Sequence, residues 1–252
     1  MSQDVTQNES GEKAERIAKV IAHAGICSRR DAEGLIAQGR VRLNGKVLDT
    51  PATLVSDADH IEVDGAPLPR KNATRLFMYH KPTGLVTTHK DERGRKTVFD
   101  ALPKDLPRLV SVGRLDLNSE GLLLLTTDGE LARYLELPAT GWSRNYRVRV
   151  FGALDQKKLD SLKNGIEVEG VKYGPIIVKV EKSAPTNSWL LVSLKEGKNR
   201  EVRKVLGALG LEVSRLLRVS YGPFQLGQLP RGNIREVHTK TLKEQIPGFF
   251  KK

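Results

Sequence analysis

The sequence predicts an α+β protein with two domains, and three observations support this fold class. The first part of the chain has two helix-like stretches followed by a hairpin signal. Further along, the short apolar run 122–125, between Gly121 and Asp128-Gly129, indicates a strand buried on both faces. A Pro-rich, basic stretch at 66–72 lies between these regions and suits a hinge. With 252 residues, the chain can build a sizeable core.

The first domain is predicted to be a small helix–helix–hairpin unit. Residues 16–24 carry apolar side chains at i, i+3, i+4 and i+7, which is typical of a one-sided helix. Ser28 and Asp31 form a capping-box-like pair that predicts the start of a second helix. Asn44-Gly45 between two short apolar stretches is the strongest short hairpin signal in the chain.

Basic side chains gather on this small unit. A helix start with neighbouring arginines suits phosphate binding, because backbone N–H groups and guanidinium groups both point at the anion. A solvated basic face is the alternative interpretation. The candidate RNA-binding residues here are Arg29, Arg30, Arg40, Arg42 and Lys46.

Composition favours a polyanionic partner in a reducing compartment. Lys and Arg total 42 against 30 Asp and Glu, so the net charge is +12 and the pI is near 9.8. The single cysteine, Cys27, excludes a disulfide framework and a cysteine-rich zinc site, and the five histidines have no ligand-like spacing. Residues 1–13 are polar and predict a disordered tail without a signal-peptide core. We expect a cytoplasmic protein without a membrane span or a metal.

Three residues of the second domain stand out by position. Asp116 precedes the buried run 122–125, where a rigid support can position a carboxylate accurately, although capping a turn is the plainer role. Tyr146 shares the inward face of an alternating strand at 145–150, and on pattern alone it is a core tyrosine. Arg203 lies at the edge of an apolar helix stripe, where a basic residue needs a partner or snorkels to solvent.

Longer motifs carry a family resemblance. Gly113-Arg114-Leu115-Asp116, followed by Gly121 and the leucine run to Gly129, resembles the motif of the RNA pseudouridine synthases, in their ribosomal-RNA branch. Asn145-Tyr146-Arg147-Val148 and residues 196–205 match further motifs of that branch, with the large-subunit type fitting best. Residues 24–33 and 39–46 are similar to the S4 RNA-binding module. The resemblance runs from residue 16 to about residue 237.

The resemblance implies a fold and a division of the chain. The family fold is a mixed, mainly antiparallel sheet with helices on its faces and a central cleft, preceded here by an S4 domain. The expected boundaries are a disordered tail at 1–13, an S4 domain at 14–66, a linker at 67–75 and a synthase domain at 76–252.

The resemblance also implies roles at the site. Asp116 is the catalytic residue, acting either as nucleophile or as base. Tyr146 stacks on the target base, and Arg203 pairs with Asp116. Leu217 supplies an apolar wall, and Arg114 holds the gap left by the flipped base or contacts the backbone. Further RNA contacts are expected from Arg93, Arg95, Lys96, Lys198 and Arg200.

The implied activity is the isomerisation of uridine to pseudouridine in ribosomal RNA, most directly the 23S RNA or a pre-ribosomal particle. The rearrangement needs no cofactor or metal, and the sequence has no nucleotide-binding glycine motif. We expect a monomer. Two alternatives stay open: a non-catalytic RNA-binding or ribosome-assembly factor, and the same enzyme class acting on 16S RNA. The sequence does not specify the uridine.

Overall fold

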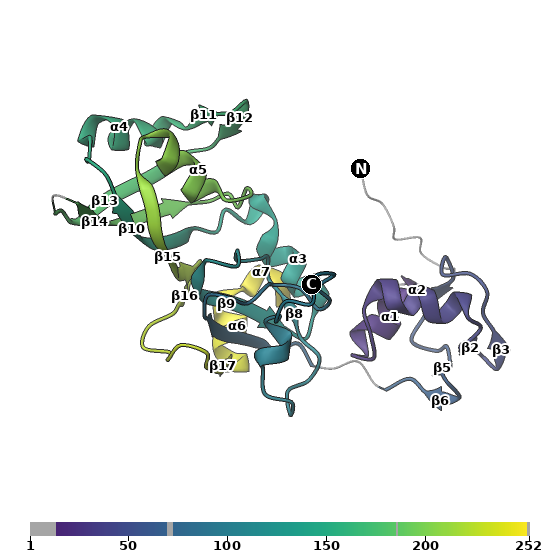
Figure 1. The fold of residues 1–252 in the computed structure, drawn as a ribbon. Coiled ribbons are helices and arrows are strands. Elements are labelled where there is room, and N and C mark those ends of the chain that lie inside the picture. The colour runs from purple at the N-terminus through teal and green to yellow at the C-terminus, as the bar shows by residue number, and fades with distance from the viewer. Residues whose placement is uncertain (1–13, 70–72, 185, 251–252) are drawn as a thin grey trace. The chain divides into compact units, whose positions relative to one another are not determined.

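The computed structural model describes residues 14–69, 73–184 and 186–250, and Figure 1 shows their fold. The chain divides into two compact units. The first reaches Thr74 and includes Thr127–Gly129, and the second holds Arg75–Thr126 and the chain from Glu130 onward. The predicted tail at 1–13 and residues 70–72 of the predicted linker lie outside the described residues. None of the helices in the described ranges has the length and apolar character that a bilayer crossing requires.

The first unit is the expected helix–helix–hairpin unit with additional short strands. Its helices pack over a four-stranded sheet of order β3-β2-β5-β6, and a two-stranded sheet pairs β1 with β4. The elements are β1 (Glu15–Arg16), α1 (Ile17–His23), α2 (Arg29–Ala37), β2 (Val41–Leu43), β3 (Lys46–Val47), β4 (Leu54–Val55), β5 (Ile61–Val63) and β6 (Ala66–Pro67).

Local signals explain these elements. The Asp31 amide donates to Ser28 Oγ at 3.1 Å, and the Ser28 amide donates to Asp31 Oδ2 at 3.2 Å, so the predicted capping box starts α2. Asn44 and Gly45 have φ angles of 50° and 80°, the left-handed pair that a tight hairpin between β2 and β3 requires. Both sequence predictions are confirmed.

The second unit is built on a mixed, mainly antiparallel sheet of nine strands, as expected. The main path runs β13-β14-β10-β15-β9-β7-β17, while β8 pairs with β9 and β16 pairs with β15. The strands are β7 (Leu76–Lys81), β8 (Val110–Ser111), β9 (Glu120–Thr126), β10 (Arg144–Phe151), β13 (Ile176–Lys182), β14 (Asn187–Leu194), β15 (Glu212–Tyr221), β16 (Phe224–Gln225) and β17 (Ile234–Val237). A separate hairpin joins β11 (Ile166–Val168) and β12 (Val171–Tyr173).

Helices cover this sheet unevenly. The α-helices are α3 (Gly129–Glu136), α4 (Gln156–Ser161), α5 (Glu201–Ala208), α6 (Thr239–Gln245) and α7 (Pro247–Phe250), and the 3-10 turns are η1 (Phe99–Ala101), η2 (Pro138–Thr140) and η3 (Leu162–Asn164). The helices α4 and α5 lie on one side of β13, β14, β10 and β15 (Figure 1), and their apolar residues join the core on that side.

The leucine run lies in β9, and all seven residues of that strand are buried. Leu122 and Leu124 belong to an apolar cluster with residues of α3 and α6. Leu123 and Leu125 belong to the cluster on the other face. A strand buried on both faces needs apolar residues at every position, which is why the run does not alternate.

The two antiparallel halves of the sheet join at one short parallel pairing, where Glu120 and Gly121 of β9 lie opposite Leu217 and Arg218 of β15. Gly121 has a φ of +104°, and a Cβ atom there would lie 2.3 Å from the carbonyl oxygen of Arg218. Only glycine fits this close approach of two backbones.

Candidate active site

A cavity of about 790 Å³ opens in the second unit beside the loop that precedes β9. Three segments distant in sequence line it: the loop with Asp116, strand β10 with Tyr146, and the start of α5 with Arg200. The structure therefore brings together an acidic, an aromatic and a basic residue that the sequence analysis singled out separately.

Lys81, a fully buried residue of β7, holds the loop that carries Asp116 in place. Its Nζ donates to the carbonyl oxygens of Asp116 at 3.1 Å, Ser119 at 2.9 Å and Pro82 at 3.1 Å. Burial lowers the pKa of Lys81 to about 8, while the charge of Asp116 acts in the opposite direction. The hydroxyl of Thr87 adds a hydrogen bond to the Leu115 carbonyl at 2.9 Å. Sequence reasoning missed Lys81 because it stands at the end of a strand, next to the Pro82 turn, where a lysine is expected in solvent.

The carboxylate of Asp116 is 31% exposed in the cavity and faces Arg200, with 3.9 Å between its Oδ2 and Arg200 Nη1. Arg200 is the N-cap of α5 and has a φ of +51°. A non-glycine residue in that region is uncommon, and such conformations cluster at functional sites. Arg200 was expected among the RNA contacts. The structure places it beside Asp116 as well, as the basic residue that faces the carboxylate.

The expected ion pair between Arg203 and Asp116 is not formed. Arg203 Nη1 donates to the Val213 carbonyl at 2.8 Å, and Nη2 donates to the Asn118 carbonyl at 3.0 Å. Burial and the nearby charge of Arg200 lower the pKa of Arg203. The guanidinium thus ties α5 and β15 to the loop of Asp116, and the direct partner of the carboxylate is one helical turn earlier, at Arg200.

Tyr146 lies in the core and also at the cavity. Its side chain is only 9% exposed and belongs to the main apolar cluster, and it also lines the cavity. Within the described part of the chain, its hydroxyl makes no hydrogen bond. Arg114 is exposed and lies at the same cavity. A ring held by a core and open on one side can serve as a stacking platform.

The prediction that Leu217 forms an apolar wall is not supported by the geometry. Leu216 lines the cavity and is 5% exposed, whereas Leu217 packs against the cluster on the other side of the sheet. Adjacent residues of a strand point to opposite faces, so the wall falls one residue earlier than expected.

Sequence reasoning also missed a pair of buried arginines at the cavity, Arg144 and Arg218. Arg144 Nη2 donates to the Tyr221 hydroxyl at 2.8 Å, and that hydroxyl donates to the Leu135 carbonyl at 2.8 Å. Arg218 Nε donates to the Leu122 carbonyl at 2.7 Å. Both arginines could have been found by alternation, because each lies two residues from an inward-facing residue of its own strand.

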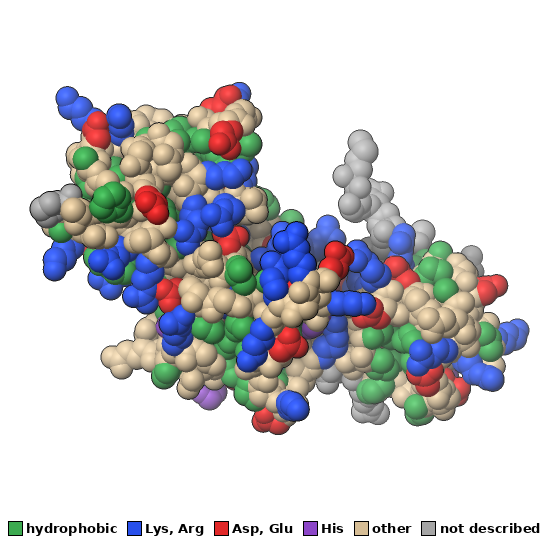
Figure 2. Space-filling view, in the orientation of Figure 1, with side chains coloured by type: hydrophobic (Ala, Val, Ile, Leu, Met, Phe, Trp, Pro, Cys, Tyr) green, Lys and Arg blue, Asp and Glu red, His purple; other side chains and the backbone are tan. Residues whose placement is uncertain are grey.

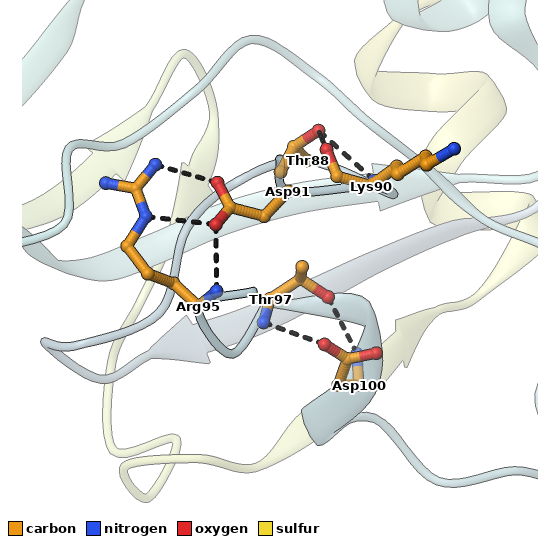
Figure 3. A network of polar contacts seen from close by, with 6 residues as sticks. All are labelled: Thr88, Lys90, Asp91, Arg95, Thr97 and Asp100. Atoms are coloured by element: carbon orange, nitrogen blue, oxygen red, sulfur yellow. Dashed lines mark hydrogen bonds and ion pairs between the residues drawn. The ribbon is translucent and has the colours of Figure 1, made fainter. Parts of the chain in front are cut away.

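The charged loop after β7 is held by its own polar contacts (Figure 3). Arg95 forms a bidentate pair with Asp91, with Nη2–Oδ1 at 2.7 Å and Nε–Oδ2 at 3.1 Å. The amide of Thr97 donates to Asp100 Oδ2 at 2.9 Å, and the amide of Asp100 donates to Thr97 Oγ1 at 3.1 Å. Of the RNA contacts expected here, Arg93 and Lys96 are exposed without such a pair, while the guanidinium of Arg95 is already engaged.

The remaining candidates differ in availability. Lys198 lines the cavity but is paired with Glu196, with Nζ–Oε2 at 2.6 Å, which raises the Lys198 pKa. In the first unit, Arg40 is tied to Asp64 by two hydrogen bonds of 2.7 Å. The other RNA-binding candidates of that unit are exposed: Arg29, Arg30, Arg42 and Lys46. Among the described residues, no cluster of His, Cys, Asp or Glu is arranged to hold a metal ion.

Comparison with known proteins identifies the class. The RNA pseudouridylate synthase family matches residues 75–208, which hold the cavity loop and most of the sheet, and the S4 domain matches residues 15–61. The fold and the site thus define an RNA-modifying enzyme with an attached RNA-binding module. The chain belongs to the RNA pseudouridine synthase family, as its motifs predicted.

Individual relatives extend over almost the whole chain. It is 47% identical over 230 residues to an uncharacterized RNA pseudouridine synthase of Rickettsia felis, covering 91% of this chain and 100% of that protein. It is 43% identical over 233 residues to ribosomal large subunit pseudouridine synthase B of Yersinia pestis, covering 90% of this chain and 73% of the relative. A crystal structure of a pseudouridylate synthase superposes with a TM-score of 0.64 at 27% identity, covering 92% of this chain and 99% of that one.

Proposed function

We propose that this enzyme converts a specific uridine of the large-subunit, 23S ribosomal RNA to pseudouridine, with Asp116 as the catalytic residue. The observation that carries the proposal is the meeting of Asp116, Tyr146 and Arg200 in one cavity of a pseudouridine synthase fold. The choice of RNA is supported by the 43% identity to ribosomal large subunit pseudouridine synthase B of Yersinia pestis. With ribosomal RNA as substrate, the cytoplasm is the proposed location.

The reaction breaks the N1–C1′ bond of uridine, turns the base and forms a C5–C1′ bond, after which the C5 hydrogen leaves as a proton. The exposed carboxylate of Asp116 can attack C1′, or it can take a proton from the sugar to give a glycal-like intermediate. Both routes act through the carboxylate oxygens, and Arg200 Nη1 faces one of them, Oδ2, at 3.9 Å. N1 of the base takes up a proton in place of its bond to C1′, so the product is an isomer of uridine and no redox partner is needed.

The target uridine has to leave its stack before C1′ can reach the carboxylate. Tyr146 is the proposed platform for the flipped base, because its ring forms part of the cavity wall. Arg114, exposed beside Asp116, is proposed to fill the gap in the RNA or to contact its backbone. Arg203 is proposed as a positioning residue, since its hydrogen bond to the Asn118 carbonyl holds the loop of Asp116.

The first unit is proposed to grip structured RNA by its backbone. The exposed residues Arg29 and Arg30 stand at the capped start of α2, and Arg42 and Lys46 lie on the following hairpin. Guanidinium groups near a helix N-terminus favour phosphate. Arg40 is left out of this proposal because Asp64 already binds its guanidinium.

The test is tritium release from ribosomal RNA labelled at uridine C5, because forming pseudouridine expels that hydrogen. Wild type and Asp116→Asn are compared on large-subunit and small-subunit transcripts separately. We expect release from the large-subunit RNA by wild type only. Release from the small-subunit RNA alone would overturn the target, and equal release by the variant would overturn the role of Asp116. If naked RNA gives no release, the same assay on an immature large subunit decides whether a particle is the substrate.

A further inference from the structure

The outer half of the sheet has one face that helices do not cover. On the inner face of β10, β14 and β15, residues such as Val148, Leu190 and Leu216 are buried under α4 and α5. On the opposite face, the side chains at the alternate positions of these strands are exposed or only partly buried: Arg147, Arg149, Lys179, Trp189, Leu191, Arg215 and Leu217. Antiparallel sheets commonly have one face in solvent. Whether this face has a binding role therefore depends on the side chains that it carries.

Basic side chains form rows across this face. In register, Lys182 lies opposite Trp189, Trp189 opposite Arg149, and Arg149 opposite Arg215. A second row contains Lys179, Leu191, Arg147 and Leu217. Neighbouring strands lie about 4.8 Å apart, so each row spans roughly 14 Å. We call the surface made by Arg147, Arg149, Lys179, Lys182, Trp189 and Arg215 the basic outer face.

Two strands of this surface are irregular, and one of the irregularities brings a charge onto it. The register shifts between Val180 and Lys182, so that Lys182 lies opposite Trp189. It shifts again on β15, where Arg149 lies opposite Arg215 and the next residue of β10 lies opposite Val213. Bulges re-aim side chains. The β13 bulge adds Lys182 to the first row, whereas Arg215 lies on this face by alternation with Leu217.

Trp189 holds two of the arginines over the sheet. The guanidinium of Arg147 lies 4.8 Å from the centre of the indole ring, and that of Arg215 lies 5.9 Å from it. Glu181 binds Arg147 at 2.6 Å, and the buried carboxylate of Glu120 binds Arg215. In both pairs the carboxylate accepts from Nε. Unlike the bidentate pairs of Arg40 and Arg95, this leaves terminal N–H groups of the guanidinium for phosphate oxygens.

The other three cations of the basic outer face have no carboxylate partner. Within the described ranges, no acidic oxygen lies within 4 Å of Arg149, Lys179 or Lys182, and all three side chains are exposed. Figure 2 shows Lys and Arg side chains gathered along the lower edge of the lobe that holds β10, β13 and β14. Like charges that converge without partners are poised for a polyanion.

We propose that the basic outer face binds the sugar–phosphate backbone of the substrate RNA, at a region away from the target uridine. This rests on the proposed function, in which a large ribosomal RNA is the substrate. A DNA duplex carries about one phosphate charge per 1.7 Å of axis, so a nucleic acid segment as long as one row offers a phosphate for each cation in it. Arg and Lys contacts to phosphate would bind RNA by shape and charge rather than by sequence.

The active cavity and the basic outer face lie on opposite faces of β10, because Tyr146 points to the inner face and Arg147 to the outer one. A short stem-loop in the cavity therefore cannot also lie on the outer face, whereas a folded ribosomal RNA domain can reach both. The surface would contribute to the choice of a large, structured substrate.

The test removes the three unpartnered charges from the full chain. The variant Arg149→Gln/Lys179→Gln/Lys182→Gln is compared with wild type and with Lys157→Gln/Lys158→Gln/Lys163→Gln. The control removes the same charge from exposed residues of α4 and η3, on the covered side of the same half-sheet. Dissociation constants for a transcript of a large-subunit RNA domain are measured at several salt concentrations, and melting curves check that both variants fold.

We expect the outer-face variant to bind the transcript about tenfold more weakly at physiological salt. Each lost phosphate contact reduces the slope of log K against log salt by about 0.7–0.9, so the slope should fall by roughly 2–3. The control variant should change the slope by less than one. Equal losses in both variants would show that only the net charge of the protein matters, and would overturn the proposal. Unchanged binding by the outer-face variant would also overturn it, and an acidic protein would then be the partner to test.

This outcome is separate from the fate of the proposed function. Tritium release by wild type on the same transcript reports the reaction, and binding by the two triple variants reports the surface. Wild-type release together with identical binding by the two variants would overturn only the surface. Absent wild-type release together with weaker binding by the outer-face variant would support the surface and count against the substrate assignment.

Discussion

The carboxylate of Asp116 is paired with Arg200 rather than with the more buried Arg203, and 3.9 Å separate Oδ2 from Nη1. At that distance, and with Arg200 48% exposed, the pair is worth little to stability. A negatively charged RNA can therefore replace the carboxylate as the partner of Arg200 with little loss of folding free energy. The geometry thus separates two basic residues at the start of α5: Arg203 hydrogen-bonds to the loop, and Arg200 faces the carboxylate of Asp116.

Replacing Arg200 by glycine should lower kcat/KM by about 10- to 100-fold, because the positive charge beside Asp116 is lost. Glycine accepts the φ of +51° without strain, so the melting temperature should not fall. Tritium release and thermal unfolding are measured on the same preparations. A variant that loses stability together with activity would assign Arg200 a structural role instead.

Arg203→Met should destabilise the protein by about 1–3 kcal/mol, because the partly buried carbonyl of Val213 and the exposed carbonyl of Asn118 lose their charged donor. Activity should fall as well, since the Asn118 carbonyl is released from its support. Urea unfolding gives the stability, and Arg203→Lys is the comparison variant. The lysine ammonium can donate to one of the two carbonyls but cannot span both as the planar guanidinium does. Arg203→Lys should therefore recover only part of the lost stability.

Tyr146→Phe should retain most of the activity, and Tyr146→Ala should lose it. The ring contributes the stacking surface, worth roughly 1–3 kcal/mol per base. The hydroxyl makes no hydrogen bond within the described residues that a phenylalanine would forfeit. Single-turnover rates for both variants on one RNA test this. Equal losses would transfer the role from the ring to the hydroxyl.

The stability contributed by Lys81 should depend on pH above neutrality. Burial lowers its pKa from 10.5 to about 8 in the folded protein. Between these two pH values the unfolded chain therefore binds more protons than the folded protein does. The destabilising effect of the buried charge is therefore complete below pH 8, and stability rises with pH between about 8 and 10.5. Unfolding free energies of wild type and Lys81→Met are compared from pH 7.5 to 10. The difference should shift in favour of wild type as pH rises, and a constant difference would contradict the assignment.

Gly121→Ala should destabilise the protein by several kcal/mol or prevent folding, because the new methyl group would lie 2.3 Å from a backbone oxygen. Gly207→Ala is the matched control. That glycine lies inside α5 with nothing within 4 Å of the added carbon, so the substitution should stabilise by about 0.5–1 kcal/mol. Melting temperatures of the two variants should move in opposite directions. Similar shifts in melting temperature for the two variants would show that the close approach of β9 and β15 does not restrict position 121 to glycine.

Much of the architecture could be predicted because local chemistry specifies it. The capping box of Ser28 and Asp31, the turn at Asn44-Gly45 and the alternation around Tyr146 each depend on neighbours a few residues away. The identity of the family followed from motifs, and the matches over 75–208 and 15–61 confirm it.

What could not be predicted depends on long-range geometry. Whether Arg200 or Arg203 meets Asp116 is decided by where α5 lies against the loop, and the helix pattern alone gives both residues similar positions. The exchange of Leu217 for Leu216 is a phase error of one residue in a strand, which reverses the face. Lys81 is invisible to pattern analysis, because its role is set by the carbonyl groups that surround it after folding.

The short parallel pairing of β9 with β15 has a consequence for how the enzyme assembles. Asp116 precedes this junction on one half of the sheet, while Tyr146 and Arg200 belong to the other half, so the cavity is complete only after the halves have met. Contacts between segments so distant in sequence form late, because the entropy of closing a long loop has to be overcome first. Catalytic competence should therefore be the last property regained on refolding, after most of the secondary structure has returned.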